Sequence, residues 1–209
     1  MKIAIAGATG LTGNLCLKEL IENEKITEIY AIGRRPTGIA HSKINEVKLE
    51  NNKLTQKVNA DAFICCLGTT IKKAGSKKAF EQIDLELPLY LAMELKSAGC
   101  KTAAVISSMG ADPKSMIFYS RVKGKMESAM KEIGFESLSI LRPSLIRGNR
   151  NEKRFGEDFA KVMMKLFDLI LIGPMKNYQS IQAKDIAKSL VKKVIEGIPG
   201  FHIYKSGRI

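Results

Sequence analysis

The chain has 209 residues, of which 45% are hydrophobic and 26% charged, and it contains no tryptophan. This size is typical of one domain whose core is large enough to fold without disulfides or a structural metal. The formal net charge of +13 favours contact with an anion, which could be a cofactor phosphate, an acidic substrate, a nucleic acid or a membrane surface. The charge is accompanied by no reading element or aromatic platform, so nucleic-acid binding is not expected.

Cysteine spacing and apolar segments narrow the class further. The four cysteines, at positions 16, 65, 66 and 100, form no CxxC pair and have no histidine nearby, which predicts reduced, buried thiols and no metal site. The apolar start is too short for a secretory signal peptide, and we expect a cytoplasmic protein. The most hydrophobic window, residues 162–175, includes Lys165 and Asp168 and is shorter than a membrane span. It predicts a buried helix or the face of a homodimer rather than a transmembrane segment.

Apolar runs of strand length alternate with longer segments of helical period, which predicts an α/β Rossmann fold with a doubly wound, mostly parallel sheet. The first half is expected to hold strands over residues 2–6, 29–32, 47–49 and 62–67, with a helix over 11–21. Next come a helix over 80–98, a strand over 102–107, a helix over 118–133 and a strand over 138–142. Beyond Pro143 we expect a basic loop, helices over 155–171 and 183–196, and a strand over 201–204.

These elements predict a single NAD(P)-binding Rossmann domain over residues 1–209, with helices on both faces of a sheet of six to seven strands. The run at 62–67 is continuously apolar, as in strands covered on both faces, and should be central. A short substrate-side region is expected at about residues 144–180.

A glycine-rich turn, GATGLTG at residues 7–13, directly follows the first strand and opens the first helix. Such a turn aims the free N–H groups and the positive dipole end of the helix at a pyrophosphate. The spacing is GxxGxxG, one residue different from the GxGxxG fingerprint. The alternative is a turn that serves strand-to-helix packing alone. The residues expected to hold the cofactor here are Gly7, Thr9, Gly10, Leu11, Thr12 and Gly13.

The end of the second strand indicates which dinucleotide is bound. An NAD-selective protein usually places Asp or Glu there for the ribose 2′-hydroxyl, but residues 29–39 contain no acid and include Arg34 and Arg35. Guanidinium groups are bidentate partners for a 2′-phosphate. The sequence therefore predicts NADP or NADPH, the alternative being that both arginines are ordinary surface charges.

A candidate catalytic group follows the fifth strand. Tyr119 and Lys123 are four residues apart and share one face of the predicted helix, and Ser108 lies at the carboxyl end of the preceding strand. An ammonium beside a tyrosine favours the phenolate and should lower its pKa toward a working value. A serine hydroxyl can hold the reacting oxygen of the substrate. Because a Tyr-x-x-x-Lys pair also arises by chance in a lysine-rich chain, a purely structural helix face is the alternative.

Several motifs together resemble those of one family, the atypical short-chain dehydrogenases related to the Tat-interacting-protein oxidoreductases. The motifs are GATGLTG, CCLGTT at 65–70, KAGS at 73–76, SSMGAD at 107–112, YSRVKG at 119–124 and LRPSLIRG at 141–148. The resemblance implies a Rossmann fold, NADPH binding and a Ser108, Tyr119 and Lys123 group, with Lys123 also contacting the cofactor. It places Gly68 and Thr69 beside the cofactor. Two features depart from the family pattern: Ser108 is closer to Tyr119 in sequence, and the substrate region is short.

The function predicted from these residues is an NADPH-dependent oxidoreductase acting on a small carbonyl or alcohol substrate. Four arginines on the expected substrate side, Arg142, Arg147, Arg150 and Arg154, would suit an acidic substrate. One alternative is a non-catalytic NADPH-binding regulatory protein. A second is an enzyme like the nucleoside-diphosphate-sugar epimerases.

Overall fold

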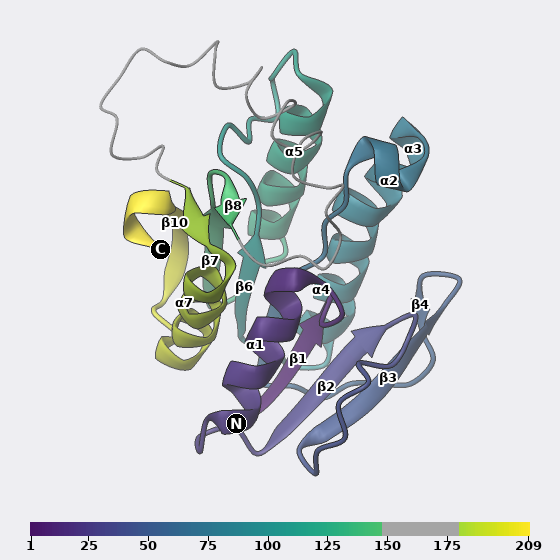
Figure 1. Ribbon diagram of the computed structural model, residues 1–209, viewed down its shortest axis with the longest axis vertical. Helices are drawn as coiled ribbons and strands as arrows, with labels where there is room; N and C mark the ends of the chain where they lie inside the picture. The colour runs from purple at the N-terminus through teal and green to yellow at the C-terminus, as the bar shows by residue number, and fades with distance from the viewer. Residues whose placement is uncertain (148–179) are drawn as a thin grey trace.

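In the computed structural model, residues 1–147 and 180–209 are described, and they form a large sheet with helices on both faces (Figure 1). The strands of this sheet are β1 (Lys2–Ala6), β2 (Glu28–Gly33), β3 (Ile44–Glu50), β4 (Lys53–Leu54), β5 (Ala62–Cys65), β6 (Thr102–Ile106), β7 (Ser137–Arg142) and β10 (Gly200–Lys205). Their spatial order is β10-β7-β6-β5-β1-β2-β3-β4, and every neighbouring pair is parallel except β3 and β4. The doubly wound α/β prediction is confirmed.

The sheet has eight strands rather than six or seven, because the two-residue β4 pairs antiparallel to β3 through a turn that the sequence pattern did not reveal. Asn51 and Asn52 occupy that turn with φ of 50° and 61°, a left-handed conformation that asparagine tolerates better than most residues. A separate short pair consists of β8 (Ile146–Arg147) and β9 (Ile181–Gln182).

The helices cover the sheet in two layers. They are α1 (Leu11–Glu22), α2 (Ile71–Ala74), α3 (Lys77–Glu81), α4 (Leu87–Ser97), α5 (Phe118–Glu132) and α7 (Ala183–Glu196), with a π-helical turn η1 (Gln82–Glu86) and a 3₁₀ turn η3 (Ser206–Arg208). Side chains of α1 and α7 pack on one face and those of α4 and α5 on the other (Figure 1). None of the helices in the described ranges combines the length and apolar character needed to cross a bilayer. The helix expected over 155–171 lies outside the described residues.

The helix expected over residues 80–98 begins slightly earlier, at Lys77, and consists of α3, the π-helical turn η1 and α4 in direct succession. The N–H of Leu87 donates to the carbonyl of Gln82, five residues back, which defines the π-helical turn. Pro88 lacks the N–H that an α-helix would donate to the carbonyl of Asp84, and its ring crowds that carbonyl. The predicted helix is therefore present, but it contains a π-helical turn next to Pro88 that the sequence did not reveal.

The chain reverses its direction of winding at the centre of the sheet. β1 pairs with β2 on one side and with β5 on the other, and all four residues of β5 are buried, as predicted for a central strand. In open α/β sheets, ligands bind outside the carboxyl ends of the strands at such a switch point. The glycine turn follows β1 there, and Gly68 lies three residues beyond β5.

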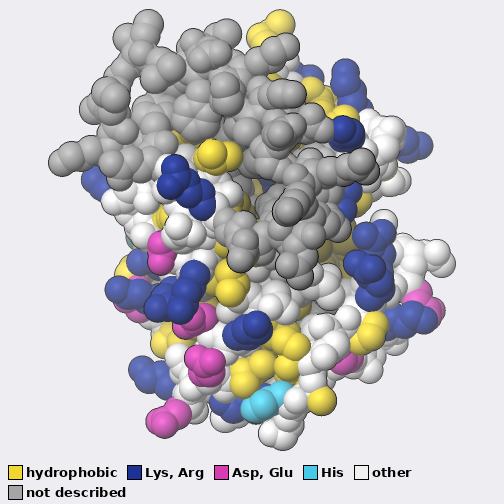
Figure 2. Space-filling model, in the orientation of Figure 1, with side chains coloured by type: hydrophobic (Ala, Val, Ile, Leu, Met, Phe, Trp, Pro, Cys, Tyr) yellow, Lys and Arg dark blue, Asp and Glu magenta, His cyan; other side chains and the backbone are white. Residues whose placement is uncertain are grey.

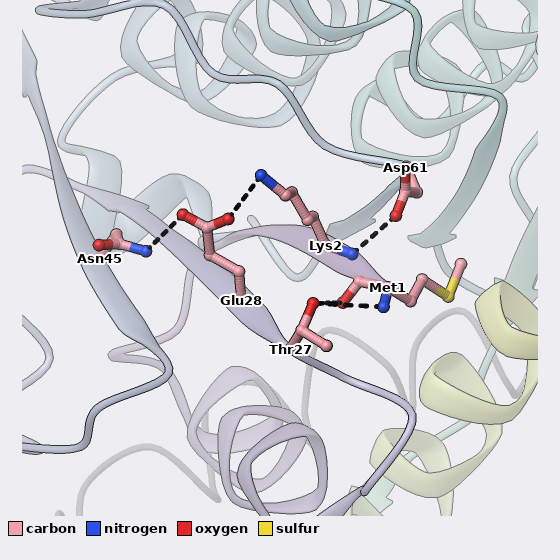
Figure 3. A network of polar contacts seen from close by, with 6 residues as sticks. All are labelled: Met1, Lys2, Thr27, Glu28, Asn45 and Asp61. Carbon is pink, nitrogen blue, oxygen red and sulfur yellow. Dashed lines mark hydrogen bonds and ion pairs between the residues drawn. The ribbon is translucent and has the colours of Figure 1, made fainter.

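The opposite, amino edge of the sheet has a polar network on the surface (Figure 3). The Lys2 ammonium lies 2.9 Å from a Glu28 carboxylate oxygen, and Asn45 donates to the same carboxylate. The backbone N–H of Lys2 donates to Asp61. These contacts link β1, β2, β3 and the residue before β5, so they fasten the strands at the edge farthest from the glycine turn.

Candidate functional site

Two glycines of the turn are required by packing alone. Gly7 has φ of 84°, and a Cβ there would lie 2.7 Å from the backbone carbonyl carbon of Cys66. At Gly13, a Cβ would collide with the carbonyl oxygen of Gly7. Both positions exclude any larger residue whether or not a ligand binds, so these glycines fix the approach of α1 to the strand ends and do not by themselves indicate a cofactor.

The start of α1 is the feature that points to a ligand. Gly10 is the N-cap residue and supplies no side-chain hydrogen bond, and both Thr9 and Gly10 are exposed. The first N–H groups of a helix have no intrahelical partner, and here they belong to Leu11, Thr12 and Gly13. No acidic residue occupies the first turn, so the positive end of the helix dipole is left uncompensated and suits an anion.

A cavity of about 110 Å³ runs from the glycine turn to the end of β2. Thr9 contributes to its wall at one end, Arg34 and Arg35 at the other, and Ile83 and Leu87 are among its apolar lining. Neither guanidinium is paired with a carboxylate among the described residues, and both arginines are exposed. The cavity is therefore lined by the turn that precedes α1, by apolar side chains and by two exposed arginines.

The loop that follows the two arginines is held in place by a residue that sequence patterns did not single out. A carboxylate oxygen of Glu46, on β3, accepts hydrogen bonds from the backbone N–H and the hydroxyl of Thr37 at 2.9 and 2.5 Å. Thr37 also lines the cavity. Glu46 therefore holds the loop through Thr37 and is not a free carboxylate. The contact could have been predicted only from the register of β2 and β3, which the sequence pattern does not give.

Lys123 and Asp84 form a buried ion pair. Their side chains are 4% and 0% exposed, and Lys123 Nζ lies 2.6 Å from Asp84 Oδ1. The other carboxylate oxygen, Oδ2, accepts the backbone N–H of Thr69 at 2.9 Å. A Cβ on Gly68 would lie 3.8 Å from Lys123 Nζ and 3.6 Å from Asp84 Oδ1. The predicted residues Gly68, Thr69 and Lys123 therefore meet at Asp84, which the sequence analysis missed.

Burial lowers the pKa of the Lys123 ammonium, but the charges of Asp84 and Tyr119 outweigh it and the net shift is upward. The pKa of Tyr119 is also raised: desolvation is the main cause, the Lys123 charge opposes it, Asp84 reinforces it and the Ser108 hydroxyl opposes it. The lowered tyrosine pKa expected from the sequence is therefore wrong. The Lys123 charge does lower the pKa of Tyr119 as expected. Desolvation of the phenol and the nearby Asp84 carboxylate raise it by more.

The third member of the predicted group, Ser108, lies just beyond β6. Its side chain is buried, and its hydroxyl oxygen has no hydrogen-bond partner of good geometry within the described residues, although it is close enough to Tyr119 to affect its pKa. The Tyr119 ring packs on Phe80, with centroids 5.5 Å apart. A buried hydroxyl without a partner is uncommon, and here it lies beside a tyrosine and a lysine.

Of the arginines expected on the substrate side, Arg142 is engaged elsewhere. Its guanidinium makes a bidentate pair with Glu127 on α5, with a shortest distance of 2.5 Å, which links β7 to α5. Arg147 is exposed on β8, while Arg150 and Arg154 lie outside the described residues. Figure 2 shows Lys and Arg side chains spread over the face drawn, with Asp and Glu among them, rather than gathered in one patch.

Three of the four cysteines, Cys16, Cys65 and Cys100, are buried as predicted, and Cys66 is partly buried. Cys65 and Cys66 contribute to the cores on opposite faces of the sheet, and the Sγ of Cys66 lies 3.9 Å from that of Cys16. Burial raises the pKa of Cys65 to about 12, whereas the hydrogen bond with Cys16, reinforced by burial, raises the pKa of Cys66. All four thiols are free.

The parallel sheet and the glycine turn at its switch point define a protein with a Rossmann fold. The chain belongs to the HIM1 family, whose sequence model matches residues 24–174. Rat Protein HTATIP2 is 36% identical over 166 residues, which span 76% of this chain and 68% of that protein. The resemblance inferred from the motifs is thereby confirmed.

Fungal relatives are similar to this chain at comparable levels. Protein fmp52, mitochondrial, of Emericella nidulans is 38% identical over 170 residues, covering 76% of this chain and 72% of its own length. Its namesake in Candida albicans is 31% identical over 210 residues, covering 96% and 90%. These relatives are named as mitochondrial proteins, so the expectation of a cytoplasmic protein is contradicted. It rested on a short apolar start, which speaks only against a secretory signal.

Solved structures with low sequence identity share the fold. MoeE5 in complex with UDP-glucose and NAD superposes with a TM-score of 0.74 at 15% identity, covering 97% of this chain and 75% of that one. Human epimerase family protein SDR39U1 with NADPH gives 0.67 at 18% identity, covering 98% and 74%. At such identities the likeness establishes the Rossmann architecture alone.

Proposed function

We propose that the protein is an NADPH-dependent oxidoreductase of the short-chain dehydrogenase type that acts on a carbonyl or alcohol substrate. The observation that carries the proposal is the position of the Lys123 ammonium. It lies against Gly68, just beyond the carboxyl end of β5, and β5 is hydrogen-bonded to β1, the strand that leads into the glycine turn. A cofactor extended across this edge would reach both the helix start and the Ser108, Tyr119 and Lys123 group.

The residues present fit a dinucleotide. The uncapped start of α1 offers N–H groups to a pyrophosphate, and the close approach of Gly7 to the backbone at Cys66 keeps the strand ends free of side chains there. The apolar wall formed by residues such as Ile83 and Leu87 suits an adenine ring. The structural relatives named with NAD or NADPH support the same class of ligand.

Selectivity for NADPH is supported by the end of β2. Arg34 and Arg35 line the cavity, and Glu46 on the neighbouring strand accepts hydrogen bonds from Thr37. A guanidinium can bind a 2′-phosphate through two parallel hydrogen bonds, whereas nothing in residues 29–39 would accept a ribose 2′-hydroxyl as a carboxylate does.

The residues of the chain would divide the work as follows. The bound cofactor supplies the hydride. Ser108 would orient the reacting oxygen through its hydroxyl, Tyr119 would give a proton to that oxygen, and Lys123 would fix the tyrosine and contact the cofactor ribose. A raised tyrosine pKa keeps the phenol protonated at neutral pH, which suits a proton donor in carbonyl reduction.

The test is NADPH oxidation measured with a panel of aldehydes and ketones, comparing the protein with a Tyr119→Phe variant. Phenylalanine keeps the ring against Phe80 and removes only the hydroxyl. We expect turnover with at least one carbonyl class, a loss of about 100-fold or more in the variant, and unchanged NADPH affinity. Equal turnover in both proteins would contradict the assigned role of Tyr119.

A non-catalytic NADPH-binding protein is the second candidate, and one observation favours it: Lys123 is already paired with Asp84, so this buried charge is balanced without a substrate or a phenolate. In that case the protein would bind NADPH, oxidise it with no carbonyl of the panel, and bind it equally well after Tyr119→Phe.

A further inference from the structure

Asp84 is the most deeply buried charged residue of the site, and both of its oxygens are engaged by groups of the predicted machinery. Oδ1 lies 2.6 Å from the Lys123 ammonium and Oδ2 accepts the N–H of Thr69 at 2.9 Å. One contact reaches α5, which contains Tyr119, and the other reaches the segment beyond β5, which is expected to border the cofactor. A single carboxylate thus connects the proton-transfer side of the site to the cofactor side.

The local backbone explains how the carboxylate comes to lie there. Asp84 is at the centre of the π-helical turn η1, between α3 and α4. The turn arises because Pro88 cannot complete an α-helical hydrogen bond to the Asp84 carbonyl. Single π-turns inserted in helices are rare and occur often at functional sites, since they change the direction in which one side chain points.

Resting on the proposed function, we propose that Asp84 is a positioning residue: it fixes Lys123 against the end of β5 and shares its charge, which leaves Tyr119 a neutral proton donor for carbonyl reduction. The energetic reason is that a lone buried ammonium is expensive, whereas a paired one persists. With the lysine's charge divided between a carboxylate and a phenol, the phenolate gains less from it.

The groups that act on Lys123 and Tyr119, both on α5, come from three other segments. They are Asp84 on η1, Cys65 on β5 and Ser108 after β6. Burial raises the pKa of Cys65 to about 12, so it stays uncharged across the useful pH range. Within residues 1–147 and 180–209, removing the carboxylate charge therefore changes the balance between Lys123 and Tyr119 and affects no other ionised partner of these two groups.

The test measures the ionisation of Tyr119 directly, from tyrosinate absorbance as pH is raised, as the difference between the protein and its Tyr119→Phe variant. In the unaltered protein we expect Tyr119 to ionise above the ordinary tyrosine value of about 10. With Asp84→Asn, measured against the Asp84→Asn and Tyr119→Phe double variant, we expect ionisation to move down by about one pH unit or more, because the Lys123 ammonium then pairs with the phenolate alone. Ionisation below about 10 in the unaltered protein, or no downward shift in the variant, would overturn the proposal.

The Thr69 contact gives a second readout that a general loss of stability would not reproduce. Asparagine keeps an oxygen that accepts the Thr69 N–H, whereas Asp84→Ala removes it. We expect NADPH affinity within about threefold of the unaltered protein for Asp84→Asn and about tenfold weaker for Asp84→Ala. Equal affinities in both folded variants would contradict the cofactor-side role.

These outcomes are separable from the proposed function. The titration requires neither substrate nor turnover, so an inactive protein whose Tyr119 titrates as expected would refute the oxidoreductase assignment and leave Asp84 in its role. An active protein whose Tyr119 titration ignores Asp84 would refute this inference alone.

Discussion

Ion pairs at the two ends of the strands, the amino edge and the carboxyl edge of the sheet, differ in burial. At the amino edge the Lys2 and Glu28 side chains are 50% and 28% exposed and belong to a chain of hydrogen bonds. At the carboxyl edge the Lys123 and Asp84 side chains are 4% and 0% exposed, and the hydroxyls of Ser107 and Ser108 have no partner of good geometry among the described residues. Folding alone disfavours the second arrangement. An unpartnered buried hydroxyl, that of Ser137, also occurs at the amino end of β7 in the described part of the chain, so the buried ion pair is the feature that distinguishes the carboxyl edge.

The sharpest test of this difference is a matched pair of serine variants. Ser108→Ala should lower turnover by about 100-fold, because it removes the hydroxyl that orients the reacting oxygen. Ser107→Ala, which removes a neighbouring buried hydroxyl that also lacks a partner, should leave turnover nearly unchanged. Both are measured as kcat and KM for a carbonyl found in the NADPH panel. A similar loss in both variants would show that the unpaired hydroxyls serve packing rather than chemistry.

Within the glycine turn, packing requires a glycine at position 13 but not at position 10. Gly13→Ala should destabilise the protein by about 3 kcal/mol, because its Cβ meets the backbone of Gly7 with no room to move. Gly10→Ala is the control: its Cβ would lie 3.3 Å from the Gly7 carbonyl oxygen and its φ of −81° suits alanine, so the cost should be about 1 kcal/mol or less. Denaturant unfolding measures both. Equal stabilities would contradict the packing role given to Gly13.

The arginines at the end of β2 should affect one cofactor and not the other. Replacing Arg34 and Arg35 with Ala should weaken NADPH binding by about tenfold or more, since a charge-assisted contact with the 2′-phosphate is lost. NADH binding should change by less than about threefold, because NADH carries no such phosphate. Parallel titrations measure both. Equal losses for the two cofactors would mean that the arginines act on a part the cofactors share.

The smallest effect is expected at the amino edge. Lys2→Ala removes an ion pair that holds the Glu28 carboxyl pKa below its ordinary value through its hydrogen bond. This contribution is present when the carboxylate is ionised and is lost as pH falls through the lowered pKa. Because the pair is exposed and screened by salt, we expect a slight fall in Tm at neutral pH, none in strong acid, and no change in NADPH affinity. A change in NADPH affinity would contradict the view that the amino-edge network takes no part in cofactor binding.

The sequence predicted the fold well because its signals are local. β1 and α7 begin and end where the apolar patterns placed them, and the glycine turn lies between a strand and a helix as expected. The features it missed depend on contacts between distant residues or on irregular backbone. Asp84 reads as one acid in an amphipathic helix until the π-turn directs it to Lys123, and Glu46 reads as a surface charge until strand register brings it to Thr37.

The lowered tyrosine pKa was mispredicted for the same reason. Sequence spacing shows that Tyr119 and Lys123 share a helix face, but it does not show how far the phenol is desolvated or which charge shares the ammonium. Both depend on α3, η1 and the residues after β6 packing around α5. Spacing can therefore propose the members of a site, whereas their protonation states follow from tertiary packing.

The most direct test of the central claim is calorimetric titration of the purified protein with NADPH and NADH in parallel. The account predicts saturable binding of one NADPH per chain, at least about tenfold tighter than NADH, with the difference narrowing as salt is raised. Absence of binding by either nucleotide, or equal affinity for both, would contradict a site built from the start of α1 and the arginines beyond β2.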